Sequence, residues 1–412
     1  MSEDSGADGT PDAGGDDSPA VGGDGEARAR ARRLAALRGC ERLLGSDPLP
    51  GIREQADRLA ASAREFVGPD EPPDLYGNGI VGALERQVAD LLGMEDAAFF
   101  PTGTMAQQVA LRAWAGRTGN PVVALHPLAH PEAHERGALA AVSGLRTVHP
   151  TTAPRLPSPL EVRDFEEPFG TLMLELPLRD AGFVLPSWQE LTETVAAARE
   201  RDAVVHFDGA RLWECTPHFG RPLPEIAGLA DSVYVSFYKS LGGISGAALA
   251  ASADLIAEAK AWRHRYGGML FQQFPAALSA LSGLRTELPR LPAYVAHAKP
   301  VARALREGLA AAGLSWPRIH PEQPHTHQFQ LWLPYPAEVL EEAAVRQAEQ
   351  TRISLFGRGR FYEPGLPGLS MTEVTVESNA LEWTEQDIHK AAESFARQVA
   401  AVTAGDDGPG PG

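Results

Sequence analysis

The middle of the chain alternates short apolar runs with segments of helical periodicity. The apolar runs lie at residues 97–100, 122–125, 171–176, 203–207, 232–237 and 247–251. Between them, apolar side chains recur at helical spacing in residues 105–115, 131–143 and 188–201. Short buried strands that alternate with helices are typical of a mainly parallel sheet covered by helices on both faces. The pattern therefore predicts an α/β fold.

Helical and mixed patterns flank this region on both sides. Residues 28–66 and 82–92 are helical in pattern, residues 253–266 form a further helix, and Thr384 begins the last one. Strands are expected at 327–333 and near 373–377. These patterns predict a disordered acidic tail at 1–27, an N-terminal helical arm at 28–75, a large α/β domain at 76–285, a small C-terminal α+β domain at 286–403 and a disordered tail at 404–412.

The composition is that of an ordinary globular protein with an acidic balance. Of the 412 residues 43% are hydrophobic, and the formal net charge is −17, of which −8 lies in residues 1–26. No stretch reaches about 18 uninterrupted apolar residues, and the N-terminus lacks a secretory signal pattern, so no membrane span is expected. The acidic balance argues against a nucleic acid as partner. Cys40 and Cys215 are too few for a disulfide scaffold, which favours the reducing cytoplasm.

Only four of the 37 basic residues are lysines, and one of them stands in unusual surroundings. Lys239 lies in SFYKSLGGISGAAL and is the only charged residue between positions 232 and 253. Lys260 and Lys390 lie on polar helix faces, and Lys299 precedes a proline. Desolvation lowers the pKa of an ammonium group and turns the amine into a nucleophile that forms a Schiff base. Lys239 is thus a candidate for covalent chemistry; the alternative is a lysine that extends to solvent from a strand end.

Two further charged residues follow the apolar run at 203–207. Asp208 stands at its carboxyl end, where ligands bind in open α/β sheets, and Arg211 comes three residues later. A carboxylate at that place pairs with a cationic ring nitrogen, and Arg211 reaches an anionic group. The alternative for Asp208 is a cap on the following turn.

A small polar turn connects the run at 97–100 to the next helix. In the segment PTGTM, Gly103 and Thr104 would direct backbone N–H groups and a hydroxyl toward an anion at the helix N-terminus. The alternative is a simple N-cap by Thr102. Together, a phosphate cradle, a strand-end carboxylate and a desolvated lysine are the parts that pyridoxal 5′-phosphate (PLP) needs from a protein.

Three histidines are four residues apart, as metal ligands on one helix face would be. They are His126, His130 and His134, and Pro127 and Pro131 interrupt the spacing. We therefore favour a structural or aromatic role for these histidines and expect no metal site.

The same segments resemble a known family. Residues 76 to about 281 are similar to the threonine aldolase and aromatic amino acid β-eliminating lyase family through YGNGIVGALERQVADLLG, AAFFPTGTMA, AHPEAHERGALAAVSG, HFDGARLWE and SVYVSFYKSLGG. The resemblance implies the PLP-dependent transferase fold type I, the fold of aspartate aminotransferase. It also implies PLP as cofactor, a small-molecule amino acid as substrate and a homodimer or homotetramer with active sites at subunit contacts.

The resemblance further assigns residues to the site. Lys239 would bond the cofactor, Asp208 would pair with the ring nitrogen, and His130 would stack on the ring near the substrate hydroxyl. Arg211 would contact the cofactor's phenolic oxygen or the substrate carboxylate. The implied catalytic residues are Lys239, His130 and Asp208, and the implied cofactor-binding residues are Gly103, Thr104, His130, Asp208, Arg211, Ser236 and Lys239.

The substrate side departs from the family. Where the family has E-N-T-H-N-G, this chain has ELPLRDAG from Glu175, so the family's second active-site histidine is missing and Arg179 offers a different group. The family's carboxylate-binding arginine is replaced by Glu373 in MTEVTVE, and the possible substitutes are Arg211, Arg179 and one of Arg358 and Arg360. Fold and cofactor therefore transfer from the family, whereas threonine as substrate does not.

These features predict an enzyme that cleaves the Cα–Cβ bond of a β-hydroxy-α-amino acid to glycine and an aldehyde. His130, acting through a water, would serve as the base near the β-hydroxyl. β-Elimination, racemisation and amino transfer stay open because one electron sink supports them all. A catalytically idle cofactor-binding protein is the third reading, and the intact Lys239 argues against it.

Overall fold

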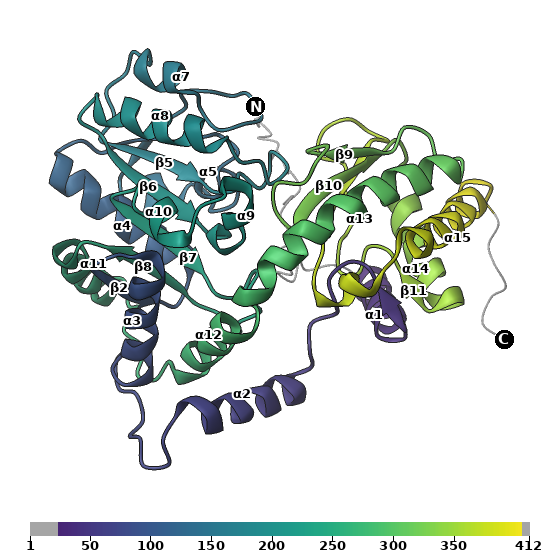
Figure 1. Ribbon diagram of the computed structural model, residues 1–412, viewed down its shortest axis with the longest axis horizontal. Helices are drawn as coiled ribbons and strands as arrows, with labels where there is room; N and C mark the ends of the chain where they lie inside the picture. The colour runs from purple at the N-terminus through teal and green to yellow at the C-terminus, as the bar shows by residue number, and fades with distance from the viewer. Residues whose placement is uncertain (1–23, 406–412) are drawn as a thin grey trace, which may run out of the picture.

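A seven-stranded sheet forms the centre of the larger part of the molecule (Figure 1). The computed structural model describes residues 24–405. The strand order is β2-β8-β7-β6-β5-β3-β4, and the neighbours from β7 to β4 are parallel, while β8 is antiparallel to β7 and β2. The strands are β2 Asp96–Phe100, β3 Val122–Ala124, β4 Arg146–Val148, β5 Thr171–Glu175, β6 Val204–Gly209, β7 Ser232–Ser236 and β8 Ala247–Ala251. The predicted α/β fold with a mainly parallel sheet is confirmed.

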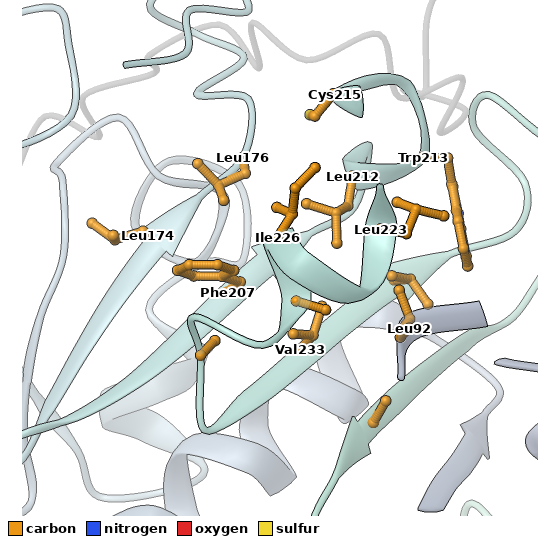
Figure 2. Close-up of a cluster of buried hydrophobic side chains, with 14 of the residues drawn as sticks. Leu92, Leu174, Leu176, Phe207, Leu212, Trp213, Cys215, Leu223, Ile226 and Val233 are labelled. Carbon is orange, nitrogen blue, oxygen red and sulfur yellow. The ribbon is translucent and has the colours of Figure 1, made fainter. Parts of the chain in front are cut away.

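Helices cover both faces of this sheet. Successive side chains along its strands point to opposite faces, and both sets are apolar. Phe99 and Phe207 belong to one core with residues of the helices α3 Ile80–Leu92, α8 Trp188–Arg199, α10 Leu223–Ala227 and α12 Phe274–Thr286. Phe100 and Leu249 belong to the opposite core, with α4 Gly103–Thr118 and α11 Ala253–Arg265. Figure 2 shows Phe207 of β6 and Val233 of β7 packed beneath Ile226 of α10.

A smaller unit follows, with its own hydrophobic core. The long helix α13, Leu291–Ala311, runs from the larger part into this unit and contacts elements of both (Figure 1). Three antiparallel strands in the order β12-β10-β9 share this core with two further helices. These elements are β9 Arg318–His320, β10 Gln328–Leu333, α14 Ala337–Thr351, β12 Ser370–Thr375 and α15 Glu385–Thr403.

Shorter elements complete the chain. They are α5 His130–Ala133, α6 Ala138–Ala141, α7 Pro159–Arg163, α9 Thr216–Phe219 and the 3-10 turns η1 Leu212–Glu214, η2 Leu288–Arg290 and η3 Ser378–Glu382. Within residues 24–405, no helix has the length and apolar character needed to cross a membrane.

The N-terminal arm differs from the single helical region expected at 28–66. It contains α1 Asp24–Arg38, the short strand β1 Arg42–Leu43 and α2 Ile52–Phe66. Residues 44–51 form no helix, a segment in which Pro48 and Pro50 disfavour one, and β1 pairs in parallel with β11 Ile353–Ser354 of the smaller unit. The helix α1 also begins inside the expected tail at 1–27, whose residues 1–23 lie outside the described residues, as do 406–412 of the C-terminal tail.

The helix expected over residues 131–143 is also wrong. The structure has two single-turn helices there, α5 and α6. Between them, Arg136 and Gly137 have φ values of 50° and 68°, a left-handed conformation that ends an α-helix. His130, His126 and His134 consequently share no helix, as the prolines predicted.

Candidate active site

The candidate site lies at the carboxyl edge of three adjacent parallel strands. In β5, β6 and β7 the last residues come into register, with Glu175 opposite Asp208 and Asp208 opposite Tyr234. Because parallel strands end on the same side of a sheet, the residues that follow them meet there. This edge brings together Glu175, Asp208, Ser236 and, in the bend just after β7, Lys239.

Lys239 and Asp208 form the electrostatic centre of this edge. Burial, followed by the charge of the nearby Arg211, lowers the pKa of Lys239 to about 8, although the charge of Asp208 opposes the change. Burial raises the pKa of Asp208, whereas Lys239 and His130 counteract that rise. Asp208 Oδ1 accepts a hydrogen bond of 3.1 Å from the amide of Ala210, which fixes the carboxylate at the strand end. A lysine with this pKa has roughly a tenth of its amine in the neutral, nucleophilic form at pH 7, far more than an ordinary lysine.

The start of α4 offers a cradle for an anion. Thr102 caps the helix, since its side chain accepts a hydrogen bond from the amide of Met105. The cap leaves the first helical amides, those of Gly103 and Thr104, directed at the space before the helix. Position 103 has no room for a side chain, because a Cβ there would collide with the hydroxyl of Tyr234. The N-cap by Thr102, given above as the alternative role of this segment, is therefore compatible with an anion site at the same helix start.

Two buried polar groups of the site lack a protein partner. Ser236 Oγ at the end of β7 and Arg211 Nε both make no hydrogen bond within residues 24–405. Buried polar atoms are normally satisfied, so orphaned ones in a site are positions at which a ligand binds. Together with the cradle at Gly103 and the amine of Lys239, they fit a group with a phosphate, an aldehyde and a ring nitrogen, as PLP has.

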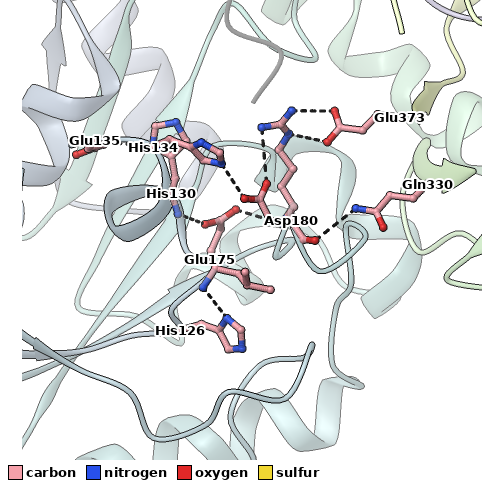
Figure 3. A network of polar contacts seen from close by, with 10 residues as sticks. His126, His130, His134, Glu135, Glu175, Asp180, Gln330 and Glu373 are labelled. Atoms are coloured by element: carbon pink, nitrogen blue, oxygen red, sulfur yellow. Dashed lines mark hydrogen bonds and ion pairs between the residues drawn. The ribbon is translucent and has the colours of Figure 1, made fainter. Parts of the chain in front are cut away.

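His130 is held in place by two carboxylates. Its backbone amide donates a hydrogen bond of 2.7 Å to Glu175 Oε2, and its ring Nδ1 lies 3.1 Å from Glu135 Oε1 (Figure 3). Glu175 also accepts a 3.1 Å hydrogen bond from the amide of Arg179. Burial, followed by the charge of Asp208, raises the pKa of Glu175 to about 7. Glu175 escaped prediction as a site residue, although it ends a strand just as Asp208 does.

Two arginines reach the site, and they differ in their partners. Arg211 precedes η1 and its guanidinium lies over the ring of Phe183, 5.2 Å from the ring centroid. No carboxylate within residues 24–405 forms an ion pair with it, so its charge is available to a ligand. Burial and Arg179 both lower the pKa of Arg211.

Arg179, in contrast, is neutralised. Its Nε and Nη2 each lie 2.9 Å from an oxygen of Glu373, which projects from β12 of the smaller unit (Figure 3). Of the arginines considered as substitutes for the family's carboxylate-binding arginine, Arg179 is therefore already paired with Glu373. Arg360 is exposed and lies 4.0 Å from Glu341, away from this pair.

The first histidine of the spaced trio contacts a different part of the chain. His126 Nε2 is 2.7 Å from the carbonyl oxygen of Ala153, and its Nδ1 accepts a hydrogen bond from the amide of Leu128. Within the described part of the chain, no three or more His, Cys, Asp or Glu side chains are grouped as metal ligands.

Known proteins share both the sequence pattern and the fold. Residues 70–331 match the sequence model of the β-eliminating lyase family. The low specificity L-threonine aldolase of Escherichia coli K12 is 31% identical over 241 residues, which cover 57% of this chain and 72% of that protein.

Two solved structures resemble the whole described fold. A candidate L-allo-threonine aldolase from Listeria monocytogenes EGD-E superposes with a TM-score of 0.81 and 31% identity over 90% of this chain and 99% of that one. A candidate aromatic amino acid β-eliminating lyase/threonine aldolase from Exiguobacterium sp. 255-15 gives a TM-score of 0.79 and 33% identity over 89% and 99% of the two chains.

Proposed function

This chain belongs to the β-eliminating lyase family, and from that premise we propose that it is a PLP-dependent lyase that cleaves β-hydroxy-α-amino acids to glycine and an aldehyde. The observation that carries the proposal is the meeting of Lys239, Asp208 and the start of α4 at one sheet edge. PLP, when bound, withdraws electrons from the bonds at the substrate Cα.

Different residues around this edge hold different parts of the cofactor. The neutral amine of Lys239 bonds the aldehyde, and the carboxylate of Asp208 keeps the ring nitrogen protonated. The amides of Gly103 and Thr104 and the orphaned hydroxyl of Ser236 hold the phosphate. His130, fixed by Glu175 and Glu135, lies against the ring.

Arg211 is the residue best suited to hold the substrate's α-carboxylate. Its guanidinium is next to Lys239 and is the arginine of the site without a carboxylate partner among the described residues. Arg179 is occupied by Glu373. A fixed carboxylate directs one Cα bond perpendicular to the ring, and that bond is the one that breaks.

The protein acts as a homodimer or homotetramer in this proposal. Tyr76, Leu270, Phe271 and Phe274 are exposed, and the rings of Tyr76 and Phe271 meet edge to face at 5.6 Å. Such a clustered apolar surface is suited to a second copy of the chain. We place the protein in the reducing cytoplasm because Cys40 and Cys215 are both free.

The direct test is a product assay on the purified, cofactor-loaded protein. It is mixed in turn with L- and D-amino acids that carry a β-hydroxyl, and glycine and aldehyde are both measured. The wild type should release the two products in equal amounts, and Lys239→Ala should release neither. As a control, Lys390→Ala changes an amine on α15 of the smaller unit and should leave activity unchanged.

The same assay distinguishes the other reactions of the cofactor. Keto acid with ammonia would indicate β-elimination, inversion without cleavage would indicate racemisation, and a keto acid formed with pyridoxamine phosphate would indicate amino transfer. Any of these in place of glycine and aldehyde contradicts the proposed cleavage. A protein that holds the cofactor and changes no amino acid would be the idle alternative.

A further inference from the structure

A second histidine lies beside His130 and is held by a carboxylate of its own. His134 directly follows α5, and its ring centroid is 5.3 Å from that of His130, with 51° between the ring planes. Its Nε2 is 2.7 Å from Oδ2 of Asp180, which lies in the loop after β5 (Figure 3). None of the roles assigned above uses this pair.

The contact with Asp180 determines which nitrogen of His134 is basic. A carboxylate accepts hydrogen bonds, so neutral His134 carries its proton on Nε2 and its lone pair on Nδ1. Within residues 24–405, no hydrogen bond occupies Nδ1. An imidazole oriented by an acid through one nitrogen, with the other nitrogen free, is the arrangement of a general base.

The neighbourhood of His134 connects it to the cofactor edge. Glu175 at the end of β5 accepts hydrogen bonds from the amides of both His130 and Arg179. The start of α5 and the loop that carries Asp180 are therefore fixed to one carboxylate at the edge where Asp208 and Lys239 lie. His134 is 12% exposed at its side chain, so a bound substrate would shield it from bulk water.

The charges around His134 favour its protonated form. The hydrogen bond that His134 donates to Asp180 raises the pKa of His134 above its usual value, and the charge of Glu175 acts in the same direction. Burial and the nearby Arg179 oppose this rise, and the rise prevails. His130 is the other titratable side chain in ring contact with His134.

On the premise of the proposed function, we propose that His134, oriented by Asp180, is the general base that takes the proton from the substrate's β-hydroxyl. Nδ1 accepts that proton, the O–H electron pair becomes the second bond of the new carbonyl group, and the Cα–Cβ pair stays on Cα. Addition of a proton at Cα then completes glycine, and protonated His134 returns its proton to solvent, so the proton count balances.

The test compares three substitutions by their pH–rate profiles. In His134→Gln, the amide nitrogen of glutamine still donates to Asp180, whereas no basic nitrogen remains. Its kcat should fall by about 10²- to 10⁴-fold with KM little changed, and the acid limb of the profile should disappear. In His130→Phe, which keeps a ring at the stacking position, the acid limb should remain. His264→Gln on the exposed face of α11 is the matched control and should behave as the wild type.

Asp180→Asn supplies a readout that a purely structural role would not change. Because Asp180 raises the pKa of His134, its loss should move the acid limb to lower pH. Histidine NMR signals of the cofactor-free protein should show the same downward shift in the titration of His134. This second readout does not depend on turnover.

The outcomes separate this inference from the proposed function. If the wild type cleaves a β-hydroxy amino acid and His134→Gln retains both kcat and the acid limb, the base lies elsewhere and the proposed function stands. If the wild type cleaves none, the proposed function fails and this assignment fails with it. If His134→Gln fails to bind the cofactor, the test rests on Asp180→Asn. The proposal is overturned if that variant has the same acid limb and the same NMR titration of His134 as the wild type.

Discussion

At the scale of single residues, Lys239 and Asp208 place opposite charges in the same apolar surroundings. Each stabilises the charged form of the other, while burial opposes both charges. For Lys239 the burial effect wins and the pKa falls to about 8. The amine is therefore reactive without being permanently neutral.

The pKa of Lys239 predicts how cofactor capture depends on pH. Only the neutral amine attacks the aldehyde, so the rate of PLP uptake by the cofactor-free protein should rise from pH 6.5 and level off above about pH 8. Stopped-flow absorbance in buffers from pH 6.5 to 9.5 measures this rate. A plateau reached only near the ordinary lysine pKa of about 10.4 would show that burial does not activate Lys239.

Asp208 should govern turnover more than cofactor binding. Asp208→Asn keeps the hydrogen bond from the amide of Ala210 but removes the charge that protonates the ring nitrogen. We expect the variant to retain cofactor, while kcat falls by roughly 100-fold or more. Cofactor content by absorbance and kcat by glycine release measure the two separately. Wild-type turnover in Asp208→Asn would remove this residue from the mechanism.

The sequence allowed some of these residues to be found and concealed others. Lys239 and Asp208 stand out locally, because each is a charge next to an apolar run. The pairs His134–Asp180 and Arg179–Glu373 join positions 46 and 194 residues apart, so no local pattern indicates them. Their partners become visible only when the fold brings β5, α5 and β12 together.

At the scale of elements, the start of α4 carries the proposed phosphate site. Gly103→Ala would place a Cβ against the Tyr234 hydroxyl, displacing either that side chain or the amides that face the phosphate. We expect the Kd for PLP to rise by about tenfold or more, which corresponds to about 1.4 kcal/mol. Fluorescence titration of the cofactor-free variants measures the Kd.

The same helix offers a matched control. Gly116 lies in α4 with open space around the position of a Cβ, so Gly116→Ala should leave the Kd unchanged. Because alanine is the better helix former, this variant should also be more stable by about 0.5–1 kcal/mol. An equal Kd in both alanine variants would mean that the start of α4 does not hold the phosphate.

The strands and helices that could be predicted are those with a clear apolar or capping pattern in the sequence. Apolar runs located six strands of the large sheet, and Thr384 located the start of α15, where its side chain forms a capping box with Asp387. The strand β4 was missed because Arg146 is exposed and Thr147 only half-buried, which removes the apolar signal. The break between α5 and α6 was missed because a left-handed arginine at position 136 has no sequence signature.

At the scale of the whole molecule, Arg179 and Glu373 connect the larger part to the smaller unit. The pair is largely buried, with side-chain exposures of 12% and 18%. It neutralises Arg179, one of the arginines that could have replaced the family's carboxylate-binding arginine, which is Glu373 in this chain. We therefore expect L-threonine to be a poor substrate, with kcat/KM below roughly 10⁴ M⁻¹s⁻¹.

Glu373→Gln should partly reverse this selectivity. The substitution frees Arg179 to attract the α-carboxylate, so the KM for L-threonine should fall by roughly fivefold, the effect of about 1 kcal/mol from one added charge interaction. Steady-state kinetics with L-threonine on the wild type and on Glu373→Gln measure this change in KM. Glu393→Gln, on the exposed face of α15, is the control. An unchanged or higher KM in Glu373→Gln would show that Arg179 does not compete for the carboxylate.

The central claim, that Lys239 holds the cofactor at the sheet edge, has one direct measurement. The PLP-loaded protein is reduced with borohydride, digested, and its peptides are identified by mass spectrometry. The account predicts the phosphopyridoxyl mass on the peptide that contains Lys239, and its absence from the peptides with Lys260, Lys299 and Lys390. The label on any of those three lysines, with Lys239 unmodified, would contradict the account.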